Sequence, residues 1–195
     1  MSAPIAILPA PGPRRLARGW RRAWWGALLL VGWSALPLHA EVSKEYQLKA
    51  AFLFNFTKFV EWPATCFADE KSPIVIGVFG RNPFEVELEN IVKGRAVNGR
   101  AIVVKFVTTA AEVRAVHLLF VPAGEETRVP VVAWQDVPLV AVGESTAFAA
   151  LGGTITFLQQ GDKVRFAINL ELADRTGLKI SAQLLKLAAS VQRKP

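Results

Sequence analysis

The chain has 195 residues, with 23 Lys and Arg against 16 Asp and Glu, which gives a formal net charge of +7. The first 40 residues hold five arginines and no acid, so the 155 residues from Glu41 onward carry 18 basic and 16 acidic side chains, or +2. A nucleic-acid-binding surface needs roughly 6–10 phosphate contacts from clustered Lys and Arg. This composition argues against nucleic acid as a partner.

The first 40 residues have the parts of an export signal. Five arginines precede an apolar run from Ala23 to Leu36, and the small residue Ala40 lies at the expected cleavage point. The run is shorter than the roughly 18 apolar residues of a membrane span. We therefore expect a cleaved signal peptide over residues 1–40 and a periplasmic protein. The alternative is an uncleaved anchor with interfacial tryptophans, namely Trp24, Trp25 and Trp33.

A single cysteine, Cys66, is present. An oxidising compartment permits disulfides, but one cysteine allows no intramolecular bridge. Core packing must then hold the protein, and a chain of about 150 residues buries roughly 70% of its unfolded surface. We expect residues 41–195 to form one domain. Cys66 is either a small packing residue or one half of an intermolecular disulfide.

The first long periodic segment runs from about Ser43 to Val60 and predicts a helix packed on a sheet. Asn55 falls inside its apolar arc, and Phe54 falls outside it. Because the residue before proline is driven out of the helical conformation, Trp62-Pro63 ends the helix. The predicted arc contains Leu48, Phe52, Leu53, Phe56, Phe59 and Val60.

Strands and helices alternate along the middle of the chain. Asn82, Pro83 and Glu85 predict the N-cap and first turn of a helix that reaches Lys93. A shorter helix is expected at 110–114. This alternation predicts a mainly parallel sheet flanked by helices. Apolar runs predict its strands, at 74–79, 101–107, 117–121 and 139–142.

The last part of the chain changes character. Segments 154–158 and 163–168 flank a four-residue turn around Gly161 and predict an antiparallel hairpin. Ser181 predicts the cap of a final helix, which would run past Val191. The apolar side of this helix is expected to hold Leu184, Leu187, Ala188 and Val191. The predicted class is α/β, with a mainly parallel sheet, flanking helices and an antiparallel hairpin near the C-terminus.

The sequence after the leader offers little for catalysis. Residues 143–147 resemble a nucleophile elbow, but no histidine follows Ser145, which we expect to cap a helix instead. His117 and Cys66 are too few nitrogen and sulfur ligands for a metal site, and we expect His117 to be buried and hydrogen-bonded. Residues 77–82 lack the spacing of a dinucleotide loop. We expect no enzymatic activity, no metal and no cofactor.

A binding surface remains as the functional feature. Trp62 either closes the helix end as a core residue or serves as an aromatic anchor, because tryptophan often carries much of the binding energy of an interface. Phe54 is expected to contact a partner, a second copy or the final helix. If Asn55 is buried, its amide must bond to a neighbouring loop. Three arginines form either a small anion site or solvated surface, namely Arg95, Arg100 and Arg165.

One segment resembles a known family. Tyr46 to Pro63, YQLKAAFLFNFTKFVEWP, is similar to the opening signature of YfiR-like periplasmic proteins. The similarity covers nearly all of the chain after the leader and keeps its order. It continues through residues 74–80, 117–120, 152–157, 164–169 and 177–181.

This resemblance implies a regulator. YfiR-like proteins repress YfiN, an inner-membrane diguanylate cyclase, by binding its periplasmic sensor region, and release raises cyclic di-GMP and favours biofilm formation. The resemblance also implies a homodimer and capture by an outer-membrane lipoprotein. Many relatives have a cysteine where this chain has Val116, so redox control through intramolecular bridges is excluded here.

The resemblance and the missing catalytic groups together predict the mode of action. We expect Lys58, Glu61 and Trp62, with Phe54, to contact the periplasmic region of an inner-membrane diguanylate cyclase and to favour its inactive state. The alternative is a small-molecule-sensing module that acts with a sensor histidine kinase. In that case Trp62 and the nearby arginines would bind an aromatic or anionic ligand.

Overall fold

A computed structural model describes residues 39–193, with side chains from residue 44 onward. The predicted signal peptide lies outside the described residues except for His39 and Ala40, which begin helix α1 (His39–Phe59). Among residues 39–193, none of the helices has both the length and the apolar character needed to cross a bilayer.

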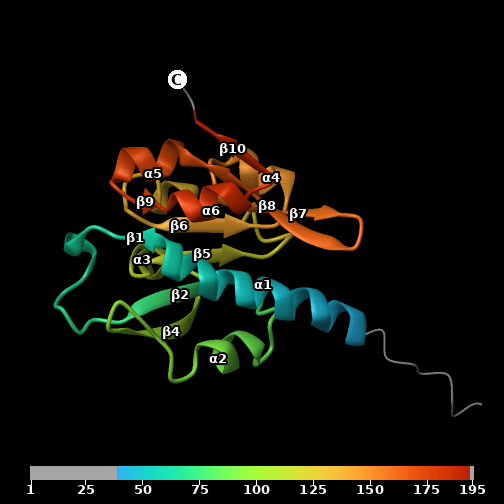
Figure 1. Cartoon of the computed structure of the whole chain (residues 1–195), viewed down its shortest axis with the longest axis horizontal. Helices are drawn as coiled ribbons and strands as arrows, with labels where there is room; N and C mark the ends of the chain where they lie inside the picture. Colours follow the sequence, from blue (N-terminus) through green and yellow to red (C-terminus); the bar gives the residue numbers. More distant parts are fainter. Residues whose placement is uncertain (1–38, 194–195) are drawn as a thin grey trace, which may run out of the picture. The chain divides into compact units, whose positions relative to one another are not determined.

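An eight-stranded sheet forms the centre of the fold (Figure 1). Its strand order is β10-β8-β7-β6-β5-β2-β4-β3. Neighbouring strands run parallel except in the β7–β8 and β3–β4 pairs. The α/β class, the mainly parallel sheet and the antiparallel hairpin near the C-terminus are confirmed. The strands are β2 (Ile74–Phe79), β3 (Ala96–Val97), β4 (Arg100–Val107), β5 (Leu118–Val121), β6 (Val140–Gly143), β7 (Ile155–Gln160), β8 (Lys163–Asn169) and β10 (Ser190–Gln192).

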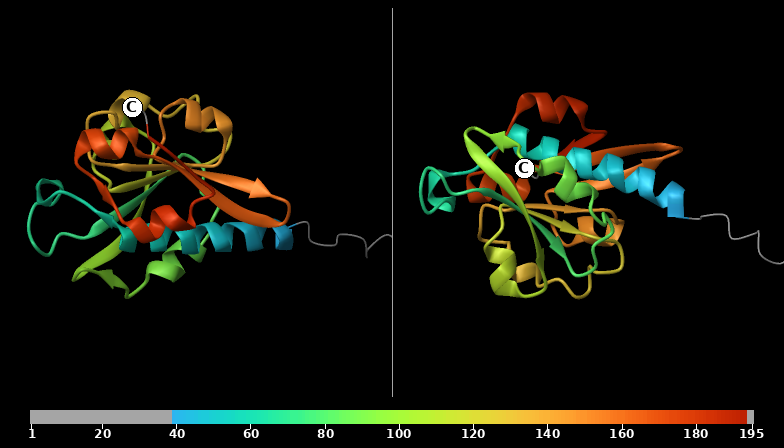
Figure 2. Two further views of the ribbon diagram at one scale, coloured as in Figure 1. Left: turned by 45° about the horizontal axis from the view of Figure 1, so that its top comes forward. Right: turned by 90° about the horizontal axis from the view of Figure 1, so that it is seen from below.

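Two apolar cores lie on the two faces of this sheet. Strand β2 divides between them, with Ile76 and Val78 in one core and Val75 and Phe79 in the other. Burial on both faces explains why the strand is apolar at every position. Figure 2 shows α1 lying across one face. That face also packs α2 (Glu87–Val92) and α6 (Ala182–Leu187), whereas the other packs α3 (Ala110–Arg114), η2 (Val131–Ala133) and α4 (Thr146–Ala150).

The predicted apolar arc of α1 is wrong at two positions. Leu48 is 45% exposed, whereas Phe54, placed outside the arc, is only 5% exposed. The reason is that α2 packs against α1 as a second neighbour beside the sheet. Asn55 is only half-buried and makes no side-chain hydrogen bond to another described residue, so the predicted bond to a loop is absent there.

The predicted start of the second helix is also wrong. Asn82 accepts a hydrogen bond from the Phe84 amide at 2.9 Å and donates to the Glu85 carbonyl at 2.7 Å, which closes a turn instead of capping a helix. Glu85 then has a φ of 52°, in the left-handed region. Because a helix cannot run through that conformation, α2 begins only at Glu87.

The C-terminal helix is shorter than predicted. Ser181 caps it by accepting a hydrogen bond from the Leu184 amide, as expected, but the helix ends at Leu187. Ala188 is extended, and β10 then pairs with the free edge of β8. Val191 therefore lies in a strand and is exposed. The sequence also gave no signal for the small pairing of β1 (Val60–Glu61) with β9 (Lys179–Ile180), which follows α5 (Leu170–Thr176).

Candidate functional site

Trp62 lies where α1 gives way to the loop that leads to β2. Its indole Nε1 donates a hydrogen bond to the backbone carbonyl of His117 at 3.1 Å, and the two rings meet edge to face. Trp62 is half-buried against the core under α1. Trp62 therefore closes the helix end as a partly buried residue, and the rest of its ring is accessible.

A stack of rings and one cation extends from Trp62. Phe67 lies almost parallel to the His117 ring, with centroids 4.5 Å apart, and the Arg100 guanidinium lies 3.8 Å from the Phe67 centroid. The same guanidinium donates to the carbonyls of Asp69 and Ser72, at 2.8 Å each. Cation–π contacts and hydrogen bonds together hold this loop in place. Its regular secondary structure is the short helix η1 (Ala64–Cys66).

His117 is buried and hydrogen-bonded, as predicted. Its Nδ1 accepts from the Val75 amide at 3.1 Å, so the neutral ring carries its proton on Nε2. Burial lowers the pKa of His117, the Cys66 backbone offsets part of this effect, and the charge of Arg100 adds a smaller lowering. Nε2 itself has no well-formed hydrogen bond to a described residue. The imidazole is therefore a neutral packing group at this site.

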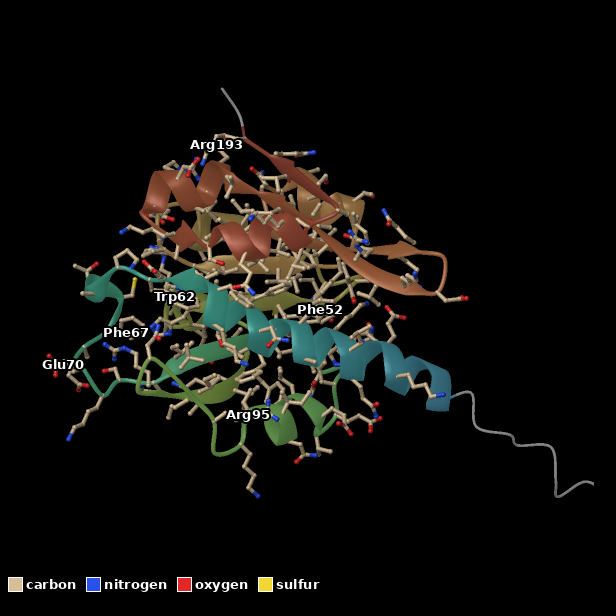
Figure 3. The ribbon with its side chains drawn as sticks, viewed as in Figure 1. Phe52, Trp62, Phe67, Glu70, Arg95 and Arg193 are labelled. Carbon is tan, nitrogen blue, oxygen red and sulfur yellow. The ribbon has the colours of Figure 1, made fainter. Side chains whose placement is uncertain are left out.

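A cavity of about 280 Å³ opens beside Trp62. Trp62, Phe67 and Arg100 provide aromatic and cationic walls, and Glu61, Thr57 and Asn98 add polar groups. Figure 3 shows Trp62 and Phe67 on the loop side of α1. A planar or anionic group fits this combination of walls.

A second cavity, also of about 280 Å³, contains the one cysteine. Cys66 lines it together with His117, Val116 and Arg114. The thiol is half-buried, and burial raises its pKa, which favours the protonated and less nucleophilic form.

Phe54 lies under two cations instead of facing outward. The Lys58 Nζ is 4.4 Å and the Arg95 Cζ 4.7 Å from its ring centroid. The prediction that Phe54 contacts a partner directly is wrong for this fold, because α2 and these cations cover the ring. Lys58 and Arg95 are themselves exposed, as is Glu61.

The three candidate arginines do not form one site. Arg100 binds the loop at Phe67, and Arg95 lies against Phe54. Arg165 is on β8, opposite Leu158 in the exposed part of the β7–β8 hairpin. Arg95 precedes β3 and is labelled in Figure 3, and Arg100 begins β4.

His117 does not lie beside Ser145. Ser145 accepts a hydrogen bond from the Phe148 amide and caps α4, as predicted. It follows the carboxyl end of β6, whereas His117 precedes the amino end of the parallel neighbour β5. The two residues therefore lie at opposite edges of the sheet, on the order of 13 Å apart along strands of this length. Within the described residues, no group of three His, Cys, Asp or Glu side chains could hold a metal ion.

A buried charge cluster at the carboxyl edge was missed by sequence reasoning. Lys49 pairs with Glu144 and Glu45, and the side chains of Lys49 and Glu144 are only 7% and 5% exposed. Tyr46 donates to Glu144 at 3.0 Å, as does the Ala123 amide at 2.8 Å. Burial, followed by the Glu144 charge, raises the pKa of Tyr46, which keeps the phenol protonated. The four-residue spacing of Glu45 and Lys49 was the only local signal.

Comparison with known proteins identified the family of this chain. Residues 46–189 match the YfiR/HmsC-like family. A search of curated proteins found no match. Among solved structures, the ABC domain in complex with L-Trp from Streptococcus pneumoniae is 16% identical, with a TM-score of 0.47. That alignment covers 75% of this chain and 60% of the other.

Proposed function

Because the chain belongs to the YfiR/HmsC-like family of periplasmic regulators in cyclic di-GMP signalling, we propose that it represses an inner-membrane diguanylate cyclase. It does so by binding the cyclase's periplasmic sensor region, which lowers cyclic di-GMP and limits biofilm formation. The family match over residues 46–189 carries this proposal, since it spans the whole Trp62 region. Members of this family are regulators and generally not enzymes.

The contact surface of this proposal is the end of α1 with the turn between α2 and β3. Lys58, Glu61 and Arg95 are exposed there, beside the accessible part of Trp62. Because Trp62 is held by its bond to His117, a partner would meet a rigid aromatic surface and lose little entropy in ordering it. Repression then requires tighter binding to the inactive cyclase than to the active one.

The remaining parts of the proposal concern location and assembly. Residues 1–40 direct export and are cleaved, which leaves residues 41–195 as a single periplasmic domain. This domain acts as a homodimer, and an outer-membrane lipoprotein competes with the cyclase for it. The leader's composition supports the export and cleavage, and the family resemblance supports the homodimer and the lipoprotein.

Affinity purification tests the proposal. The protein, purified as the cell exports it, is immobilised and exposed to solubilised inner membranes of its own organism, and captured proteins are identified by mass spectrometry. We expect a membrane protein with a periplasmic region and a diguanylate cyclase domain. Capture of no signalling protein contradicts the proposal.

The cavity beside Trp62 favours a second candidate function. Its aromatic and cationic walls suit a small aromatic or anionic ligand. The effect of ligand binding would be transmitted to a sensor histidine kinase. Thermal-shift measurements with nucleotides and aromatic amino acids test this candidate. A ligand at 100 times its Kd adds about 2.7 kcal/mol to the free energy of unfolding. No shift with any of these compounds removes the candidate.

A further inference from the structure

Two cations share one aromatic ring at the end of α1. The Nζ of Lys58 and the Cζ of Arg95 lie 4.4 and 4.7 Å from the Phe54 centroid. Neither has a carboxylate of a described residue within 4 Å. Glu61, the acid nearest to Lys58 along the chain, lies opposite Lys179 in the β1–β9 pair. The two charges are therefore unpaired within the described part of the chain.

The backbone of both residues is held by the fold. Lys58 is in the last turn of α1, and the Arg95 carbonyl accepts a hydrogen bond from the Ile102 amide. Their distances to one centroid place the charges no more than about 9 Å apart. Screening at physiological salt acts over about 8 Å, so repulsion between charges at up to this separation is only partly screened. An anion that reaches both would relieve this repulsion.

We propose that Lys58 and Arg95 form a two-cation clamp for an acidic peptide segment of the membrane partner. This inference rests on the proposed function and adds the chemistry of the partner. Carboxylates two residues apart on a strand, or four apart on a helix, are separated by about 6–7 Å, which suits the clamp. The low net charge after the leader leaves little long-range attraction for a nucleic acid or a lipid surface.

An NMR titration of the ¹⁵N-labelled exported protein tests the clamp. The probes are a ten-residue peptide of alternating Glu and Thr and its counterpart of alternating Lys and Thr. We expect the Glu peptide alone to shift signals of residues 54–62 and 93–98, with weaker binding at higher salt. Lys58→Gln/Arg95→Gln is expected to raise the Kd at least tenfold. The matched control Lys163→Gln/Arg165→Gln removes the same charge from the β7–β8 hairpin and should leave the Kd within twofold.

Several results would overturn the clamp. These are equal binding of both peptides, an unchanged Kd in the Lys58→Gln/Arg95→Gln variant, or binding only to vesicles that contain anionic lipid. Urea unfolding of each variant shows whether the fold is retained, and Lys58→Glu/Arg95→Glu should abolish binding if it is. Membrane capture by the Gln variant separates the two proposals. Undiminished capture of a cyclase refutes the clamp alone, whereas peptide binding without any cyclase capture refutes the proposed function alone.

Discussion

The Trp62 indole and the His117 carbonyl join the end of α1 to the start of β5 through a hydrogen bond of 3.1 Å. The same carbonyl also accepts from the Val140 amide, at 2.9 Å, so the bond reaches the β5–β6 pair as well. This contact ties the end of α1 to the amino-terminal ends of the central strands β5 and β6.

Substitution of Trp62 should separate the hydrogen bond from the packing. Trp62→Phe removes the bond but keeps an aromatic ring, and we expect it to cost about 1 kcal/mol. Trp62→Ala also removes half-buried aromatic surface, for a total of about 2–4 kcal/mol. Urea unfolding measures both values. Equal costs for the two variants would show that the packing contributes nothing.

The Lys49–Glu144 pair gives a second stability prediction. Lys49→Met leaves a buried carboxylate without its cation, so we expect a loss of about 3–5 kcal/mol. The double variant Lys49→Met/Glu144→Gln should lose less than the two single variants combined. Glu45→Gln serves as the control and should cost under about 1 kcal/mol, because Glu45 is more exposed. Additive costs in the double variant would mean that the pair is not coupled.

His117 predicts a pH dependence of stability. Its pKa is lowered in the folded protein, chiefly by burial, so the unfolded chain binds a proton first as the pH falls. The stability that depends on the neutral ring is therefore complete above about pH 6.5 and declines below it. Asparagine can also accept from the Val75 amide, so His117→Asn should reduce the loss between pH 7.5 and 5.5. Parallel pH profiles for both proteins would contradict this prediction.

Close packing around two glycines predicts that their substitution by alanine lowers the stability by different amounts. A Cβ on Gly153 would overlap the ring of the fully buried Phe148, whereas one on Gly77 would meet the side chains of Val116 at 3.0 Å and Leu119 at 3.3 Å. Both glycines have φ values that alanine can adopt, so the difference is one of space. We expect Gly153→Ala to cost more than about 2 kcal/mol and Gly77→Ala less. The reverse order in urea unfolding would be inconsistent with this packing.

Local signals were sufficient for much of the fold. Asn98 and Gly99 form the turn between β3 and β4, with φ values of 51° and 78°, because those two residue types tolerate the left-handed region. Ser145 and Ser181 cap their helices through bonds to amides three residues away. Each of these features depends on neighbours along the chain, which is why the sequence predicts it.

Features that depend on distant segments were predicted poorly. A helical wheel assumes one buried side, but α2 covers a second side of α1 and buries Phe54. Val191 keeps a helical spacing yet joins β8 as a strand, since the edge of that strand was open to pairing.

The candidate site shows the same division. Trp62 could be singled out by residue type, whereas its bond to His117 spans 55 positions. The stacking of Phe67 on His117 and the pairing of Lys49 with Glu144 each depend on residues far apart in the sequence, so only the fold reveals them.

The cellular concentration of cyclic di-GMP tests the central claim most directly. The measurement compares cells that lack the gene with cells complemented by the wild type, by Lys58→Glu/Arg95→Glu, or by Lys163→Glu/Arg165→Glu as the control. The account predicts that deletion raises cyclic di-GMP, that the wild type and the control restore the low level, and that the Lys58→Glu/Arg95→Glu variant does not. An unchanged concentration on deletion would contradict the account.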